Sequence, residues 1–385
     1  MIEEGVALSL GRTTKPELRK ETLPMRYVGI DYHKHYSVLC ATDERGQELK
    51  QRRIKGNTAA GFAQFFSELG EQNKVVMEAC WNWGWLYDLL GQIDQVGEVV
   101  LAHPYKTRLI AEAQIKTDRI DAQTLAKLLR GDLIAQSHAP SAATRARKHL
   151  LRQRLFWVRL RTMLRNRMHA ILDRQHGLER PQLKNFFSRR GQTWLEGVEL
   201  PCAEDQPLLK QDLEVAALLD QKIKELDRAI GQSQSVEEKL LESIPGIGPL
   251  FSSVIATEID GIERFHSAAK LAAYAGVVPT THASGGRVFH GRLLWQCNKW
   301  LRWALIEASW TAIQFSGYFG AIYRNARARG KNKHVAITMV AHRMAKIIWL
   351  LLKEKRPYTE TLPDRSEDQV TVAPRRKAFS LASSC

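Results

Sequence analysis

Short apolar runs alternate with helical periodicity across residues 26–129, and this alternation restricts the fold more than any other feature of the sequence. The expected strands are rich in β-branched and apolar residues and span 27–31, 36–42, 47–54, 75–78 and 98–102. The expected helices have apolar spacing of three or four residues and span 58–69, 85–93 and about 106–129. Three strands in a meander, followed by alternating helix and strand, predict an α/β domain that resembles the ribonuclease-H fold.

Acidic side chains stand at the ends of two of these expected strands. Asp31 ends the first run and Glu78 ends the fourth. In the last helical segment Asp118 and Asp121 are three residues apart and therefore share one face of a helix. Two strand-borne acids and a helical acid pair are what a two-magnesium phosphodiester site requires, because Mg²⁺ takes oxygen ligands and two ions can hold the attacking and leaving oxygens. The alternative is that these are four ordinary surface acids.

The charge of the chain favours a polyanionic partner. Lys and Arg number 57 against 41 acids, a formal net charge of +16. Residues 141–190 hold 14 Lys or Arg against two acids, a net +12. Since few acids in this segment compensate the charge, we expect arginines of the helical stretch 145–174 to contact nucleic-acid phosphates; they are Arg152, Arg154, Arg159, Arg161, Arg165 and Arg167. A solvated charged helix is the alternative.

The five cysteines predict neither a zinc site nor a disulfide framework, because no pair has C-x-x-C spacing. The N-terminus has no apolar signal core, and no run of 18 apolar residues occurs in the sequence, so no membrane segment is expected. The sequence therefore predicts a soluble cytosolic protein with reduced thiols.

The second half of the chain is expected to be mainly helical. Apolar residues from Leu209 to Ile230 step by three or four and predict a long coiled-coil helix, which pairs either with the basic helix or with a second subunit. Residues 175–205, between the two long helices, are expected to be irregular. Strongly helical sequence returns at 303–352. Residues 1–24 are expected to form a loose extension and residues 356–385 a disordered tail.

Two glycine-containing segments could contact a phosphodiester. Residues 244–249 resemble the hairpin of a helix-hairpin-helix motif, in which Gly246 and Gly248 would let backbone amides approach a phosphate; a plain tight turn would use the same residues. Further on, Ser284 precedes two glycines. A hydroxyl there can attack a phosphodiester if nearby cations stabilise the developing charge, although most such triplets are flexible loops; the nearby cations in the sequence are Arg287, Arg292, Lys299 and Arg302. Of these, Arg287, Arg292 and Arg302 are expected to bind nucleic acid.

In this order, the motifs resemble those of the insertion sequence 110 family of transposases, which are DEDD recombinases guided by a bridge RNA. The resemblance covers about residues 25–355. The motifs similar to the family's RuvC-like domain are Gly-Ile-Asp at 29–31, Met-Glu-Ala at 77–79 and Lys-Thr-Asp-Arg-Ile-Asp-Ala at 116–122. Those similar to its transposase domain lie at 244–249, 274–279, 284–286 and 301–302.

The resemblance implies a RuvC-like DEDD domain at 25–144, a basic helix and coiled coil at 145–240, and a helical transposase domain at 241–355. Asp31, Glu78, Asp118 and Asp121 would hold Mg²⁺, and Ser284 would attack DNA to form a phosphoserine intermediate. The implied partners are donor and target DNA, a structured bridge RNA and further copies of the chain, as a dimer or a tetramer. Such an enzyme would work in the bacterial cytoplasm, at the nucleoid.

Some positions depart from the family pattern, and two other functions remain open. His33 stands where relatives often have Ser, and residues 81–85 and 294–297 also differ from the usual pattern. The first alternative is a RuvC-like junction-resolving nuclease that uses metal-activated water. The second is an architectural nucleic-acid-binding protein that needs none of the four acids.

Overall fold

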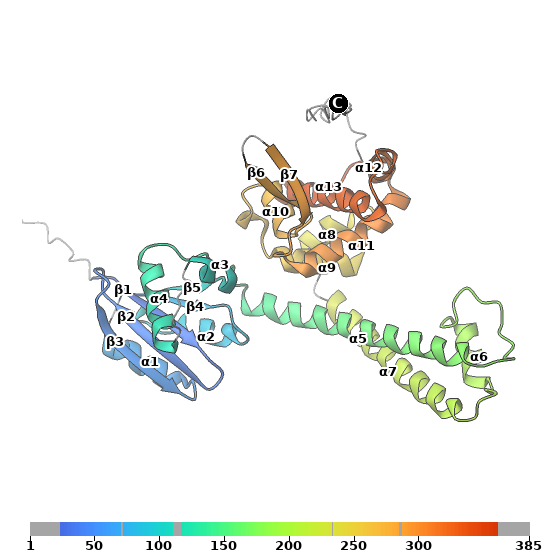
Figure 1. Ribbon diagram of the computed structural model, residues 1–385, viewed down its shortest axis with the longest axis horizontal. Helices are drawn as coiled ribbons and strands as arrows, with labels where there is room; N and C mark the ends of the chain where they lie inside the picture. The colour runs from blue at the N-terminus through green and yellow to red at the C-terminus, as the bar shows by residue number, and fades with distance from the viewer. Residues whose placement is uncertain (1–23, 71, 111–116, 233, 285–286, 361–385) are drawn as a thin grey trace, which may run out of the picture. The chain divides into compact units, whose positions relative to one another are not determined.

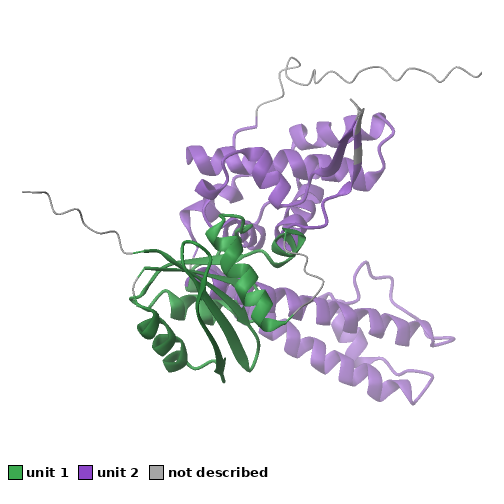
Figure 2. Cartoon of the chain, turned by 60° about the vertical axis from the view of Figure 1, so that its left-hand side comes forward, with its two compact units in different colours: residues 1–142 green, residues 143–385 purple. Residues whose placement is uncertain are grey.

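The computed structural model describes residues 24–70, 72–110, 117–232, 234–284 and 287–360 (Figure 1). The chain divides into two compact units, residues 1–142 and residues 143–385 (Figure 2). The expected extension at 1–24 and the expected tail at 356–385 lie almost entirely outside the described residues. The finer division into three domains stays a prediction.

Unit 1 is built on a five-stranded sheet with the strand order β3-β2-β1-β4-β5 (Figure 1). β1, β2 and β3 pair as an antiparallel meander, whereas β1 pairs in parallel with β4, and β4 with β5. The strands are β1 (Arg26–Tyr32), β2 (Tyr36–Thr42), β3 (Glu48–Lys55), β4 (Asn73–Glu78) and β5 (Val96–Ala102). The predicted mixed α/β domain is confirmed.

Helices cover both faces of this sheet (Figure 1). α1 (Ala59–Leu69) and α2 (Trp83–Leu90) bury their apolar sides against one face, together with alternate residues of the strands. α4 (Asp118–Arg130) covers the other face, where its Leu125 packs with Val76 of β4. Because successive side chains of a strand point to opposite faces, the two helical layers divide the residues of β1 and β4 between them.

The sequence predicts a continuous helix from about Lys106 to Leu129, and this prediction is wrong. α3 (Pro104–Ile110) is a separate helix, and α4 begins at Asp118 because Thr117 has extended backbone with φ −142° and ψ 150°. The Thr117 hydroxyl accepts a hydrogen bond from the amide of Ile120 at 3.2 Å, which is an N-cap. This cap places Asp118 and Asp121 in the first turn of α4.

Unit 2 begins with a pair of long antiparallel helices, α5 (Ala142–Asp173) and α7 (Asp205–Gly231) (Figure 1). Met168 and Ile171 of α5 belong to the same buried cluster as Leu209 of α7. The long helix predicted by apolar spacing is confirmed, and it pairs with the basic helix of the same chain.

The segment between the two long helices contains a helix that the sequence did not predict. α6 (Arg189–Gly197) begins after Ser188, whose hydroxyl accepts a hydrogen bond from the amide of Gly191. Leu195 of α6 is buried in the cluster formed by α5 and α7. The prediction of irregular structure for 175–205 is therefore wrong over α6, because tertiary packing stabilises a helix whose own apolar pattern is short.

The rest of unit 2 is a helical body around α13. Its elements are α8 (Val236–Glu242), α9 (Pro249–Ile259), the 3-10 helix η1 (Ile262–Arg264), α10 (Ala268–Tyr274), α11 (Lys299–Phe315), α12 (Gly317–Ala328) and α13 (Lys333–Glu354). α13 packs with α10, α11 and α12. Among the described helices, α13 alone is long and apolar enough to cross a membrane, but half of its apolar window is buried inside unit 2. It is accounted for as a core helix.

A β-hairpin interrupts this helical body, and the prediction of a helical domain at 241–355 did not include it. β6 (Pro279–Ser284) and β7 (Arg287–Leu293) pair antiparallel, with Ser284 opposite Arg287. The signal was present in the sequence, since a two-residue Gly-Gly connection between β-prone runs is typical of a hairpin.

Candidate functional site

Gly29 lets α4 lie directly against β1. A Cβ atom at this position would stand 2.0 Å from the carbonyl oxygen of Ala122 and 2.6 Å from the amide nitrogen of Ala126. Any other residue would therefore push the helix off the strand. Asp31 is two residues further along β1 and points to the same face as Gly29. The close approach of the helix brings the acids of its first turn towards Asp31.

Asp31 and Glu78 occupy equivalent positions on neighbouring strands. Ile30 of β1 is paired with Met77 of β4 in the parallel register, so the next residue on each strand is an acid. Asp31, Glu78 and Asp121 line one cavity of about 310 Å³. The structure thus brings together three of the four predicted ligands in one place.

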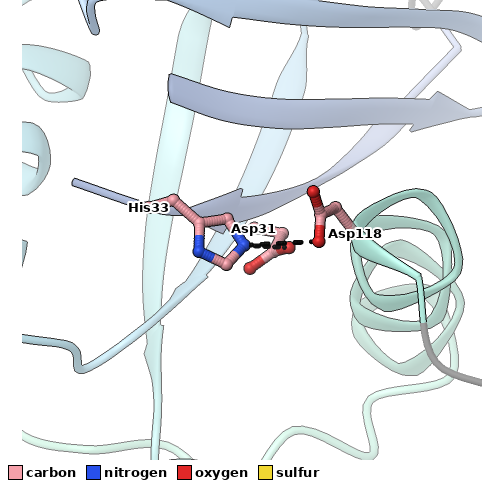
Figure 3. Close-up of side chains that lie close together, drawn as sticks. All are labelled: Asp31, His33 and Asp118. Atoms are coloured by element: carbon pink, nitrogen blue, oxygen red, sulfur yellow. Dashed lines mark hydrogen bonds and ion pairs between the residues drawn. The ribbon is translucent and has the colours of Figure 1, made fainter. Parts of the chain in front are cut away.

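Asp118 approaches Asp31 through His33. Nε2 of His33 lies 2.9 Å from Oδ2 of Asp31 and 3.6 Å from Oδ1 of Asp118 (Figure 3). The hydroxyl of Tyr36 donates a hydrogen bond of 2.8 Å to Oδ2 of Asp118, which fixes that carboxylate. His33 was not among the site residues predicted from the sequence. The sequence did offer one indication of its role, because His33 lies two residues after Asp31 and such a residue points to the same face of an extended chain.

The electrostatics of Asp31 show that the acids influence one another. Burial raises the pKa of Asp31 above its ordinary value of 3.8, and the charges of Asp118 and Asp121 raise it further, although His33 acts in the opposite direction. Carboxylates that repel one another at the edge of a sheet are stabilised by a cation. Oxygen atoms of Asp31 and Asp118 and a nitrogen of His33 lie within 4.8 Å of one another, so the donor set fits a divalent metal ion.

Ser284 lies in unit 2, exposed at the end of β6. Arg292 is exposed on β7. Arg302 donates a hydrogen bond to the carbonyl of Leu294. Its guanidinium also lies next to Gly276, because a Cβ atom at position 276 would stand 2.2 Å from it. Arg302 therefore holds the segment that follows the hairpin. Its predicted role in binding nucleic acid, like that of Ser284 as the nucleophile, stays a prediction.

Five of the six arginines predicted to bind nucleic acid form ion pairs inside unit 2. The pairs are Arg152–Glu258, Arg154–Asp227, Arg161–Asp220, Arg165–Asp220 and Arg167–Asp212, at 2.5–3.3 Å. The premise that few acids compensate the basic segment is therefore wrong, because α7 and α9 supply them. The guanidinium of Arg159 lies 5.3 Å from the ring centre of Trp300. Arg167 keeps 57% of its side chain exposed, so contact with phosphates stays open as a prediction.

The two glycines between α8 and α9 have different surroundings. Gly246 has φ 90°, and a Cβ atom there would stand 2.3 Å from the carbonyl oxygen of Ala308 in α11. Packing therefore explains Gly246 without a ligand. Gly248 is exposed just before α9, and a Cβ atom there would meet nothing within 4 Å. Of the two, Gly248 is the more exposed, and its contact with a phosphate stays a prediction.

Two family models match the chain. Residues 28–176 match the DEDD model of IS110, described as a transposase. Residues 238–324 match a model described as the transposase IS116/IS110/IS902 family. The first segment contains His33 and all four acids, and the second contains Gly246, Gly248 and Ser284.

Curated relatives extend the similarity over most of the chain. The transposase for insertion sequence element IS1111A of Coxiella burnetii is 25% identical over 93% of this chain and 98% of its own length. The transposase for IS1328 of Yersinia enterocolitica is 24% identical over 84% of this chain and 96% of its own length. An uncharacterized 44.8 kDa protein of insertion element IS116 from Streptomyces clavuligerus is 28% identical, over 38% of this chain and 37% of its own length.

Proposed function

Because the chain is a transposase of the IS110/IS116/IS902 family with a DEDD domain, we propose that it is an RNA-guided DNA recombinase that excises and inserts its own mobile element. The family relationship establishes DNA transposition. The finer proposal rests on one observation. Four acids gather at the C-terminal ends of β1 and β4 and the start of α4, and the same chain carries an exposed Ser284.

The acids would hold the metal ions of the reaction. Asp31, Glu78, Asp118 and Asp121 offer the oxygen ligands that Mg²⁺ prefers. Bound divalent ions would neutralise the negative charge that develops on a phosphate during strand cleavage. Tyr36 orients Asp118 by its hydrogen bond, and Gly29 keeps α4 close enough to β1 for the acids to converge.

Ser284 would be the nucleophile. Its Oγ loses its proton and forms a bond to phosphorus, the bond from phosphorus to one deoxyribose oxygen breaks, and that leaving oxygen gains a proton, so the number of protons is unchanged. The exposure of Ser284 at the end of β6 supports this role, since DNA can reach the hydroxyl. Ser284 and the four acids belong to different units, so the proposal requires that the units meet over the scissile phosphate, within one chain or across subunits.

A structured RNA of the element would supply sequence specificity by pairing with donor and target DNA. The protein then needs mainly backbone contacts, which suits its net charge of +16. The candidate phosphate contacts are Arg159, Arg167, Gly248, Arg287 and Arg292. The active form would be a dimer or tetramer acting on chromosomal DNA in the cytoplasm, at the nucleoid.

Substitution of Ser284 tests the nucleophile. Ser284→Ala should abolish covalent protein–DNA adducts on denaturing gels, because the attacking oxygen is removed, while binding of DNA and metal remains. Thr281→Ala, on the same strand, is the matched control and should keep the adduct. Adducts that persist in Ser284→Ala would refute the assignment.

A junction-resolving nuclease is the second candidate. It is favoured by the location of all four acids in unit 1, where they could activate water without Ser284. In that case wild-type protein would leave free DNA ends with no protein attached. A wild-type adduct that is lost in Ser284→Ala would exclude this alternative.

A further inference from the structure

His33 stands inside the acid cluster with a fixed orientation. Its ring nitrogen reaches both Asp31 and Asp118 (Figure 3). Its ring also stacks on that of Tyr36, with centres 4.9 Å apart. Its backbone is also held, since its amide donates to the carbonyl of Tyr36 at 3.0 Å and its carbonyl accepts from Nδ2 of Asn57 at 2.7 Å. The imidazole is therefore positioned before any ion arrives.

The spacing of the donor atoms matches that of ligands around one ion. In an octahedral site with bonds of about 2.1 Å, neighbouring ligand atoms are about 3.0 Å apart and opposite ones about 4.2 Å apart. Nε2 of His33 lies 2.9 Å from Oδ2 of Asp31, close to the neighbouring distance. It lies 3.6 Å from Oδ1 of Asp118, between the two limits. Small adjustments would allow all three atoms to bind the same ion.

We propose that His33 is a nitrogen ligand of the metal site and makes this site favour Mn²⁺ over Mg²⁺. The inference rests on the proposed function, in which the four acids hold divalent ions. Mg²⁺ demands hard oxygen ligands, whereas first-row transition ions accept imidazole nitrogen together with carboxylate oxygen. Carboxylates accept both ions, so an imidazole in place of one oxygen donor shifts the relative affinity of the site towards Mn²⁺.

The other role for His33 is a hydrogen bond to Asp31 with no bond to the ion. The two roles differ in what a bound ion senses. A directly coordinated imidazole transfers spin density from Mn²⁺ to its nitrogen, whereas a histidine that only donates a hydrogen bond to a ligand does not.

Pulsed electron paramagnetic resonance of Mn²⁺ bound to the full-length protein separates these roles. In wild-type protein the electron spin echo of Mn²⁺ should show the modulation caused by a directly bound ¹⁴N nucleus. Labelling of histidine with ¹⁵N should replace this signal with that of ¹⁵N. His33→Gln should lose the modulation. His35→Gln, an exposed neighbour two residues away, is the matched control and should keep it.

Metal titrations give a second measurement that does not depend on activity. His33→Gln should weaken Mn²⁺ binding by roughly 10-fold and Mg²⁺ binding by far less, so that the ratio of the two affinities changes. Absence of ¹⁴N modulation in wild-type protein, or an unchanged affinity ratio in His33→Gln, would overturn the proposal. Asp118→Asn identifies a deeper failure: if it leaves Mn²⁺ binding intact, the ion lies elsewhere, and the acid site itself is refuted.

Discussion

Asp31 is the residue at which the demands of folding and of metal binding conflict. It is largely buried, it faces two other carboxylates, and its pKa is raised by burial above all. Charging this carboxyl therefore destabilises the folded protein when no ion is present. Residues placed for chemistry often carry such a cost.

Replacing Asp31 with Asn should stabilise the metal-free protein at neutral pH. The folded-state pKa is above the ordinary value of 3.8, so the destabilisation is absent at pH below 3.8 and complete above the folded-state pKa. Asp31→Asn should raise the Tm by roughly 1–3 °C at pH 7 and by less as the pH falls towards 4. Calorimetry measures this, with exposed Asp94→Asn as the control. A lower Tm at pH 7 in metal-free buffer would show that Asp31 stabilises the fold.

Gly246 and Gly248, which lie between α8 and α9, should respond differently to an added methyl group. Gly246→Ala should lower the free energy of unfolding by roughly 2–4 kcal/mol, because φ is 90° and the Cβ atom would collide with α11. Gly248→Ala should leave stability almost unchanged, since its Cβ atom meets nothing within 4 Å. Denaturant titration measures both. Equal losses of unfolding free energy in the two variants would mean that the described backbone between α8 and α9 is wrong.

At the scale of elements, the α5–α7 pair shows why the basic segment misled the sequence argument. The apolar spacing of both helices is a local property, so both helices could be predicted from the sequence. The ion pairs join residues such as Arg161 and Asp220, 59 positions apart, so no window of sequence displays them. The same limit explains α6, which depends on Leu195 packing against α5 and α7.

Asp220 should control how much positive charge this helix pair offers. It pairs with Arg161 at 2.5 Å and with Arg165 at 3.3 Å. Asp220→Asn should free both guanidinium groups, steepen the salt dependence of DNA or RNA affinity, and lower stability by about 1 kcal/mol. Glu214→Gln removes an exposed acid of the same helix and serves as the control. If both variants have the same salt slope, the nucleic acid does not contact this part of α5.

At the scale of the whole molecule, the chain consists of two units whose site residues are distinct. The mixed α/β character of unit 1 followed from the sequence, because the periodicity of strands and helices is a local property. The grouping of the four acids into one site was predicted from their positions near the ends of regular elements, without the strand order. The hairpin that carries Ser284 was missed, since its two strands lie in an otherwise helical region. The contacts of His33 were also out of reach, because they depend on how α4 meets β1.

Divalent ions should stabilise unit 1 and leave unit 2 unchanged. Ligand at 100 times its Kd adds about 2.7 kcal/mol to the state that binds it, which corresponds to a shift of several degrees. Scanning calorimetry of the full chain with Mn²⁺ or Mg²⁺ should therefore move one transition only. Asp118→Asn should abolish the shift. Movement of both transitions would mean that the metal links the units or binds in unit 2.

Gly29 has a consequence for any attempt to re-engineer this enzyme. Since the gap between β1 and α4 is set by a missing methyl group, the spacing of the carboxylates is encoded by a residue that never touches the ion. Ala at position 29 would act as a wedge and spread the donors beyond the reach of one cation, while every acid remained in place. A library that preserves the four acids but randomises this position would consist mostly of inactive proteins in which α4 no longer packs against β1.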